Sequence, residues 1–315
     1  MRHFIDTSEY DRSTLEAILT YAITHRGERS TALAGRAVAL IFFDSSLRTR
    51  TSFAVGIAQL GGMSVTLEVG RGAWNLEYLD GTVMDGDKPE HVADAARVLS
   101  RYFDVLAVRC FPSLKQAAED QADPVIEAFR RHATVPVVNL ESALYHPCQA
   151  MADMMTIRER FGRTDGLRVA LAWTPHVKAL PTAVPNSFAL AAVQLGCQLT
   201  IVAPPGFSLP ETVMARLPGV EVVHDQSVLA TQDVVYAKSW TSLENYGAPP
   251  PAHYRSWMLT PEKLGRARFL HCMPLRRNVE VTDAVLESAQ NDCYDEAENR
   301  LHVQKAILLY CLNLI

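Results

Sequence analysis

Hydrophobic and polar positions along the chain follow two different periods. Short continuous apolar runs, such as Ala37–Phe43, are typical of buried strands in a parallel sheet. Between these runs, apolar residues recur every three or four positions, which predicts helices with one buried face. Strands are predicted at residues 37–43, 63–67, 105–108, 135–138, 169–173, 199–203, 220–224, 234–237 and 269–272. This alternation predicts an α/β fold with two doubly wound parallel-sheet domains.

Local signals mark the ends of several predicted helices. Ser13-Thr14-Leu15-Glu16 is a capping box, and Asp123-Pro124 has the residue types typical of the first positions of a helix. Further helices are expected after residues 53, 89 and 146, and at 186–195, 210–217, 261–266, 282–288 and 296–312. We expect residues 1–145 to form the first domain and 146–295 the second. A last helix of about 296–315 should pack back on the first domain.

Composition limits the classes of partner. The chain has 315 residues, of which 48% are hydrophobic, enough for two ordinary domains. A net charge of −5 argues against nucleic acid or an anionic membrane as the main partner. No apolar run reaches the roughly 20 residues that span a bilayer. The six cysteines are scattered and the N-terminus resembles no signal peptide, so we expect reduced thiols in a cytoplasmic protein.

The polar stretch after the first apolar run predicts an anion site. Asp44 to Phe53 joins a strand to a helix, so free backbone N–H groups and the positive end of the helix dipole meet there. Ser46, Arg48 and Thr49 add hydroxyl and guanidinium donors. These residues fit a phosphate-sized anion. The alternative is a hydroxyl-rich helix cap with solvated arginines.

Other polar residues follow neighbouring strands and should meet this turn. Arg109 and Glu141 end two predicted strands, and ligands of parallel sheets sit at carboxyl ends. His146 and Gln149 lie one helical turn apart, and both can donate to a carbonyl oxygen. A histidine in this place is otherwise a helix cap.

Three features later in the chain are candidates for the site, and each also has an ordinary structural explanation. Arg276 and Arg277 follow the last predicted strand, where paired arginines are commonly solvated. Cys272 is otherwise a buried thiol, because a nucleophilic role needs a base nearby. Lys305 would lie on the polar face of the last helix. No metal-ligand spacing, Walker A loop or G-x-G-x-x-G occurs, so we expect neither a metal nor a cofactor.

Together these motifs resemble the aspartate/ornithine transcarbamylase family. The matching residues span nearly the whole chain in the family's order: Ser46-Leu47-Arg48-Thr49-Arg50, Arg109, His146-Pro147-Cys148-Gln149 and His271-Cys272-Met273-Pro274. The resemblance implies transfer of a carbamoyl group from carbamoyl phosphate to an amine. It also implies two α/β domains and a homotrimer with shared active sites.

Within the family, the chain is most similar to the branch that carbamoylates Nα-acylated ornithine. Residues 236–240 lack the S-M-G motif of the free-ornithine enzymes, and Cys272 replaces the proline of the aspartate enzymes. Trp74, Glu141 and the stretches 174–181 and 295–305 match the acylornithine branch. The product would be N-acylcitrulline, in arginine biosynthesis.

The resemblance assigns roles to individual residues. It implies carbamoyl phosphate binding by Ser46, Leu47, Arg48, Thr49, Trp74, Arg109, His146, Gln149, Cys272, Met273 and Arg300. Trp74 would act from a neighbouring subunit. Acylornithine would be bound by Glu141, Lys178, Lys238, Cys272, Met273, Arg276 and Arg277. Lys305 would be an N6-carboxylysine in the active site. A trefoil knot is expected, in which the loop near 174–185 encloses a segment of 238–255.

The acyl group is predicted from Pro89. The N-acetyl enzymes carry a glutamate there, which would repel the carboxylate of a succinyl group by roughly a kcal/mol or more. Pro89 removes that charge, so we expect N-succinyl-L-ornithine to be preferred. The alternatives are an N-acetyl-L-ornithine enzyme and a non-catalytic homologue that binds carbamoyl phosphate.

Overall fold

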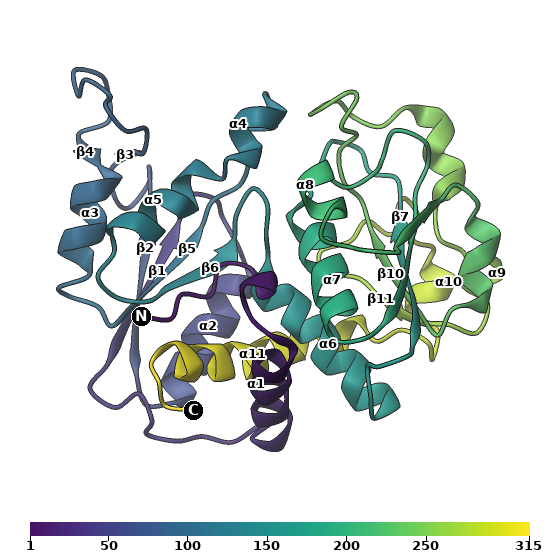
Figure 1. Cartoon of the computed structure of the whole chain (residues 1–315), viewed down its shortest axis with the longest axis horizontal. Helices are drawn as coiled ribbons and strands as arrows, with labels where there is room; N and C mark the ends of the chain where they lie inside the picture. The colour runs from purple at the N-terminus through teal and green to yellow at the C-terminus, as the bar shows by residue number, and fades with distance from the viewer.

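The computed structural model describes residues 1–315 and shows two α/β lobes side by side (Figure 1). The first lobe contains a sheet of four strands that all run parallel. In spatial order these are β2 (Met63–Glu68), β1 (Ala37–Phe42), β5 (Val105–Arg109) and β6 (Val137–Glu141). Alternate residues of β1 enter different cores: Val38 and Leu40 face one side of the sheet, and Ala39 and Ile41 face the other.

Helices cover both faces of this sheet. One face packs on α3 (Val92–Leu99) and α5 (Pro124–His132). The other face packs on α1 (Arg12–Thr24) and α2 (Arg48–Gln59). Short α4 (Ala117–Gln121) lies at the tip of the lobe, as Figure 1 shows.

The second lobe repeats this plan with five parallel strands. Their spatial order is β11 (Arg268–Leu270), β10 (Val234–Lys238), β7 (Arg168–Trp173), β8 (Gln198–Val202) and β9 (Glu221–Val223). The helices around it are α7 (Ala183–Gln194), α8 (Glu211–Met214), α9 (Pro261–Leu264) and α10 (Asp283–Leu286). Three 3₁₀ turns complete the chain: η1 (Thr7–Glu9), η2 (Gln226–Thr231) and η3 (Ala252–Trp257).

Two long helices connect the lobes. The chain crosses from the first lobe to the second in α6 (Pro147–Phe161) and returns in α11 (Cys293–Cys311), so the C-terminus lies beside α1 (Figure 1). Both helices contribute to one apolar core with α1, α2 and α7. No helix is long and apolar enough to cross a membrane.

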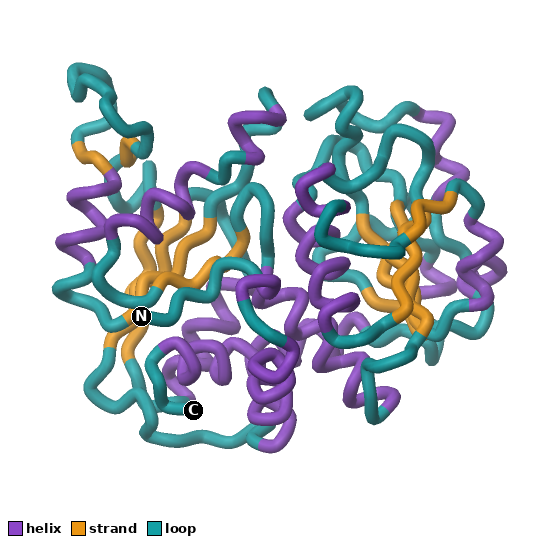
Figure 2. The backbone as a smooth tube through the Cα atoms, in the orientation of Figure 1, coloured by secondary structure: helices purple, strands orange, loops and turns teal.

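The strand order of each sheet places its expected ligand-binding crevice at the junction between the lobes. In a doubly wound sheet, loops diverge where the order reverses, which leaves a crevice at the carboxyl ends of the strands. The order reverses between β1 and β5 in the first sheet and between β7 and β10 in the second. Figure 2 shows loops, drawn in teal, gathered at these strand ends.

Several local predictions differ from the structure at their ends. The cap of α1 is Asp11, whose carboxylate accepts from the Thr14 N–H, and Ser13 already lies in the first turn. Asp123 makes no cap bond to α5, because its φ of 46° is left-handed and its carboxylate binds Ser142, Ala143 and Leu144. The sequence did not predict α4 or the two-stranded pair β3 (Leu76–Glu77) and β4 (Glu90–His91).

The capping difference can be tested by paired substitutions. Asp11→Ala should lower the midpoint of thermal unfolding more than Ser13→Ala, because only the former removes the acceptor at the helix start. Hydrogen bonds from Thr14 and Ser13 hold the pKa of the Asp11 carboxyl below its usual value. Its stabilisation is therefore present at neutral pH and lost as the pH falls through that lowered pKa. The gap between the two variants should close in acid. Equal midpoints at neutral pH would contradict this assignment.

Candidate active site

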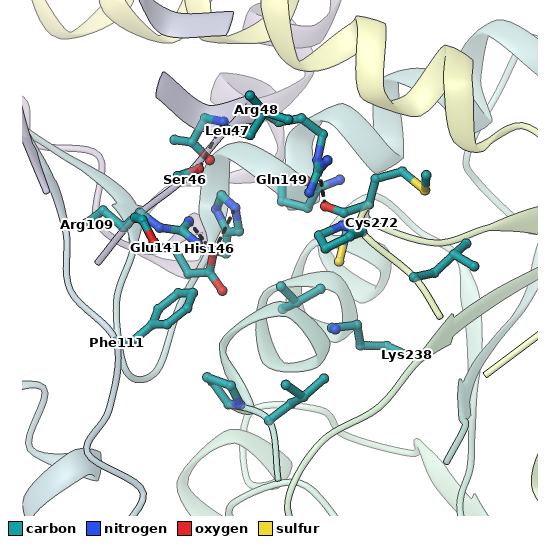
Figure 3. A pocket seen from close by; sticks show the side chains of 18 of the residues that line it. Ser46, Leu47, Arg48, Arg109, Phe111, Glu141, His146, Gln149, Lys238 and Cys272 are labelled. Atoms are coloured by element: carbon teal, nitrogen blue, oxygen red, sulfur yellow. Dashed lines mark hydrogen bonds and ion pairs between the residues drawn. The ribbon is translucent and has the colours of Figure 1, made fainter. Parts of the chain in front are cut away.

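A cavity of about 490 Å³ lies between the lobes, and residues from both sheets line it. It collects most of the residues that the sequence singled out, and Figure 3 shows their side chains converging. The predicted residues on its wall are Ser46, Leu47, Arg48, Thr49, Arg109, Glu141, His146, Gln149, Lys178, Lys238, Cys272, Met273, Arg276 and Arg300. Residues separated by more than 250 positions in the chain thus share one site.

The strand-to-helix turn after β1 forms one wall. The Thr49 N–H donates to the Ser46 hydroxyl at 3.2 Å, which closes the turn at the start of α2. Arg48 extends across the junction, and its Nε donates to the Met273 carbonyl at 2.9 Å. The two Nη atoms of Arg48 therefore remain available to donate hydrogen bonds to a ligand at the boundary between the lobes.

Six cationic side chains line this cavity. Lys178 and Arg276 are exposed, and the four that are buried or partly buried come from four different elements. Arg48 begins α2, Arg109 ends β5, Lys238 ends β10 and Arg300 lies on α11. Burial lowers the pKa of the Arg48 and Arg300 guanidinium groups, and repulsion from Arg109 lowers both further. The buried Nε atoms of Arg109 and Arg300 have no partner. This concentration of positive charge, with free donors, fits an anion better than a neutral ligand.

One carboxylate partly balances these charges. Glu141 Oε2 lies 2.5 Å from Arg109 Nη1, and both side chains are about nine-tenths buried. The same oxygen lies 3.5 Å from His146 Nε2. The Phe111 ring stacks on the Arg109 guanidinium, with 4.3 Å between the Cζ atom and the ring centroid. Arg109 is therefore held by a carboxylate and by an aromatic ring.

His146 is a neutral imidazole in this setting. Burial lowers its pKa well below the usual value, and the charges of Arg300 and Arg109 add to that effect. Its Nδ1 atom has no partner, and its backbone N–H donates to the Ser187 hydroxyl at 2.7 Å. A neutral imidazole can donate one hydrogen bond to a carbonyl without adding another cation.

Gln149 differs from its predicted role. Its Nε2 donates to Asp153 Oδ1 and to Glu296 Oε1, each at 2.8 Å. Both amide hydrogens are therefore used below the cavity, and Oε1 has no partner. The sequence led us to expect a donor toward a carbonyl oxygen, whereas the structure leaves only an acceptor free. Neither carboxylate was predicted: Asp153 is one turn away on the same helix, but Glu296 is 147 residues away.

The thiol of Cys272 lies among charged groups. Burial alone would raise its pKa, yet the charge of Lys238 and a hydrogen bond from His271 lower it. His271 is itself paired with Glu280 at 3.4 Å. Burial disfavours the charged form of His271, but the nearby Glu280 carboxylate raises the pKa of His271 to about 9. Burial likewise disfavours the charged form of Glu280, but His271 lowers the pKa of Glu280 to about 2. Although burial acts against its charge, the pKa of Lys238 is raised because Cys272, Glu280 and Glu141 favour the ammonium.

Four predicted residues lie outside the cavity. Trp74 and Pro89 lie together on an exposed loop of the first lobe, where Trp74 Nε1 donates to Glu90 at 2.6 Å. Arg277 is exposed and paired with Asp283 and Glu287, so its charge is already used on the surface.

Lys305 was expected inside the active site and lies elsewhere. Its Nζ donates to the Glu28 carbonyl at 2.8 Å and to Gln59 Oε1 at 3.1 Å, in a small separate cavity of about 30 Å³. Burial lowers the pKa of this lysine. The face of α11 that carries Lys305 therefore differs from the face that places Arg300 in the main cavity.

The structure also adds residues that the sequence did not identify as part of the site. These further lining residues are Ser45, Phe111, His176, Leu180, Pro181, Val184, Pro274 and Leu275. His176 Nε2 accepts from Arg276 Nε at 3.1 Å, which links two loops of the second lobe. Phe111 lies two residues beyond Arg109, so its position just after that strand was the sequence signal that could have assigned it to the cavity.

The arrangement places an end rich in arginine and hydroxyl groups beside an end that combines apolar side chains with lysines. Hydroxyls and guanidinium groups can hold a phosphate, and His146 can donate to a carbonyl beside it. Lys238 and Cys272 border the other side of the carbonyl position, where a second substrate would enter. Leu180, Pro181 and Val184 provide an apolar wall for its remaining atoms.

Sequence comparisons agree with this geometry. Residues 2–159 match the carbamoyl-P binding domain of aspartate/ornithine carbamoyltransferases, and residues 177–311 match their Asp/Orn binding domain. The N-acetylornithine carbamoyltransferase of Xanthomonas campestris is 43% identical, over 98% of this chain and 97% of that protein. The N-succinylornithine carbamoyltransferase of Bacteroides fragilis is 38% identical, over 83% of this chain and 82% of that protein.

Solved structures show the same fold. N-acetyl-L-ornithine transcarbamylase complexed with acetylcitrulline superimposes with a TM-score of 0.95 at 41% identity, over 98% of this chain and 99% of that one. A variant of that enzyme, in which one glutamate is replaced by proline, matches equally well and holds carbamyl phosphate and N-succinyl-L-norvaline. The chain therefore belongs to the aspartate/ornithine carbamoyltransferase family, in its N-acylornithine branch.

Proposed function

We propose that this carbamoyltransferase transfers the carbamoyl group of carbamoyl phosphate to Nδ of N-acetyl-L-ornithine, giving N-acetylcitrulline and phosphate for arginine biosynthesis. The observation that carries the donor half is the group of three arginines, Arg48, Arg109 and Arg300, around the hydroxyl-bearing turn. The acceptor half is supported by the N-acetylornithine relatives, which are more similar over more of the chain than the N-succinylornithine relatives. This evidence favours acetyl over the succinyl group predicted from the sequence.

The proposed reaction depends mainly on positioning and electrostatics. Arg48 and Arg109 hold the phosphate with the Ser46 and Thr49 hydroxyls, and His146 donates to the carbonyl oxygen as charge develops there. The acceptor amine arrives neutral, attacks the carbonyl carbon and loses its proton to the departing phosphate. Lys238 meets the carboxylate of the acyl amino acid. The free, buried cysteines are suited to a reducing compartment such as the cytoplasm.

Arg48→Ala tests the phosphate assignment. The variant should fold normally and lose about 100-fold or more in kcat/KM for carbamoyl phosphate, because a charge that stabilises the transition state is removed. Citrulline formation at subsaturating carbamoyl phosphate measures this loss. Arg50→Ala is the matched control, since Arg50 pairs with Glu68 outside the cavity. Near-normal activity of Arg48→Ala would refute the phosphate site.

N-succinyl-L-ornithine is the second candidate acceptor, and Pro89 is the observation that favours it. Related acetyl enzymes in which one glutamate is replaced by alanine, proline or valine hold N-succinyl-L-norvaline. By family resemblance, Pro89 occupies the position of that glutamate. Parallel assays of both acylornithines decide between the two acceptors, and free ornithine should react hardly at all.

Pro89→Glu tests the role of this position. The ratio of kcat/KM for acetylornithine to that for succinylornithine should rise by about tenfold, because a new carboxylate repels the succinyl carboxylate. Pro89→Ala is the control, since it removes the ring without adding a charge. An unchanged ratio in Pro89→Glu would remove Pro89 from the acyl site.

A homotrimer would explain why Trp74 and Pro89 lie outside their own chain's cavity. We propose that this loop completes the site of a neighbouring subunit. Mixed oligomers of inactive Trp74→Ala and Arg48→Ala chains should then regain activity, since some sites would draw both intact residues from different chains. Sedimentation gives the subunit number. A monomer, or mixtures that stay inactive, would count against sharing.

We further propose the predicted two-domain division and the knot. Two contacts join the segments concerned: the Thr241 N–H donates to the Leu180 carbonyl at 2.9 Å, and the Thr174 N–H to the Lys238 carbonyl at 3.0 Å. Pulling a single unfolded chain from both ends should give a contour shorter than the full extended length. A full-length contour would exclude the knot.

A further inference from the structure

Directly below the cavity, two buried carboxyl groups hold the side-chain amide of Gln149. Gln149 and Asp153 lie four residues apart on α6, and α11 brings Glu296 against them. Nε2 of Gln149 lies 2.8 Å from Asp153 Oδ1 and 2.8 Å from Glu296 Oε1. All three residues are at most 1% exposed, so water does not replace these contacts.

This geometry permits one orientation of the amide. An NH₂ group has two hydrogens, and each has a carboxylate oxygen as its acceptor. A flipped amide would place Oε1 against these two oxygens, which share one proton between them, and would leave both of its own hydrogens unpaired, which is unfavourable in a buried site. Glu296 is fixed in turn, because its second oxygen accepts from the His271 N–H at 2.9 Å.

The ionisation of the pair is consistent with this arrangement. Burial raises the pKa of Asp153 to about 7 and the pKa of Glu296 well above its usual value. A hydrogen bond with Asp153 helps to retain the proton on Glu296. One shared proton leaves enough acceptor oxygens for both amide hydrogens of Gln149.

The consequence is visible at the cavity wall. Oε1 of Gln149 has no partner, and it can only accept a hydrogen bond. An NH₂ group on a bound ligand would satisfy it, whereas a methyl group of similar size would leave it unpaired. Loss of such a hydrogen bond in a buried site costs about 1–3 kcal/mol, equivalent to about tenfold or more in affinity.

We propose that Asp153 and Glu296 are positioning residues that keep the Gln149 oxygen toward the cavity, so that the site selects carbamoyl phosphate over acetyl phosphate. This inference rests on the proposed function, because it concerns the donor of the same reaction. Both acids act through Gln149 and do not themselves contact the substrate.

Glu296→Gln is the informative variant. The new amide has one oxygen, and the buried His271 N–H needs that oxygen as its acceptor. The NH₂ group of residue 296 would then face Gln149, which would have to turn its own oxygen away from the cavity. Asp153→Asn is the matched control. Its oxygen can stay toward Gln149, because no backbone N–H requires the second carboxylate oxygen of Asp153 as an acceptor.

The measurement compares two stable phosphonates of similar shape. Phosphonoacetamide carries the NH₂ group, and phosphonoacetone carries a methyl group in its place. The unmodified protein should bind the amide about tenfold or more tightly than the ketone, and Glu296→Gln should lose most of that ratio. Asp153→Asn should keep most of it. Thermal unfolding of each variant confirms that it is folded.

The other outcomes are equally distinct. An equal loss of affinity for both phosphonates in Glu296→Gln would show a structural role only and overturn the proposal. So would loss of the ratio in Asp153→Asn while Glu296→Gln keeps it. If neither phosphonate binds the unmodified protein, the proposed function itself fails. If both bind equally well, only the present inference fails.

A second measurement uses the unmodified protein, in case Glu296→Gln does not fold. Glutamine side chains are labelled with ¹⁵N, and the Gln149 signal is assigned with Gln149→Asn. Both amide hydrogens should already be protected from exchange with D₂O before any ligand is added. Addition of phosphonoacetamide should leave that protection unchanged. Rapid exchange in the free protein, followed by protection on binding, would overturn the proposal.

Discussion

The structure depends on holding four buried or partly buried cations around one cavity. Arg48, Arg109, Lys238 and Arg300 would repel one another if nothing fixed them, and burial makes the repulsion stronger. The three arginines are held differently: Arg48 by a carbonyl of the other lobe, Arg300 by the Thr49 hydroxyl, and Arg109 by Glu141. Favourable packing elsewhere in the protein offsets the free-energy cost of this repulsion, and binding of an anionic substrate reduces that cost.

The helix pair α6 and α11 makes the arrangement possible. α6 begins at the cavity, so His146 and Gln149 face the substrate, while Asp153 lies one turn lower. On α11, Glu296 supports Gln149, and Arg300, one turn later, donates to Thr49. Because both helices pack in the core between the lobes, a shift of α11 would move Arg300 and Glu296 together, and a shift of α6 would move Gln149 and Asp153.

The exposed loop that carries Trp74 and Pro89 does little to stabilise its own lobe. A large aromatic side chain left 61% exposed contributes little to the stability of its own lobe. Its hydrogen bond to Glu90 keeps the ring beside Pro89, so the two residues form one unit on the surface. The choice of acyl group and the assembly of subunits would therefore depend on the same loop.

The sequence alone determined the strands of the two large sheets, because apolar runs record burial, although it missed the short pair β3 and β4. It also determined the family, because Ser46–Thr49 and His146–Gln149 are local motifs. Tertiary structure decided which side chains share a cavity. It separated Lys305 from Arg300, although both lie on α11, and paired Arg277 with surface acids. It also turned the Gln149 amide, since the orientation depends on Glu296, 147 residues away. Local patterns encode burial and backbone conformation, whereas hydrogen-bond direction is set by partners that only the folded chain brings together.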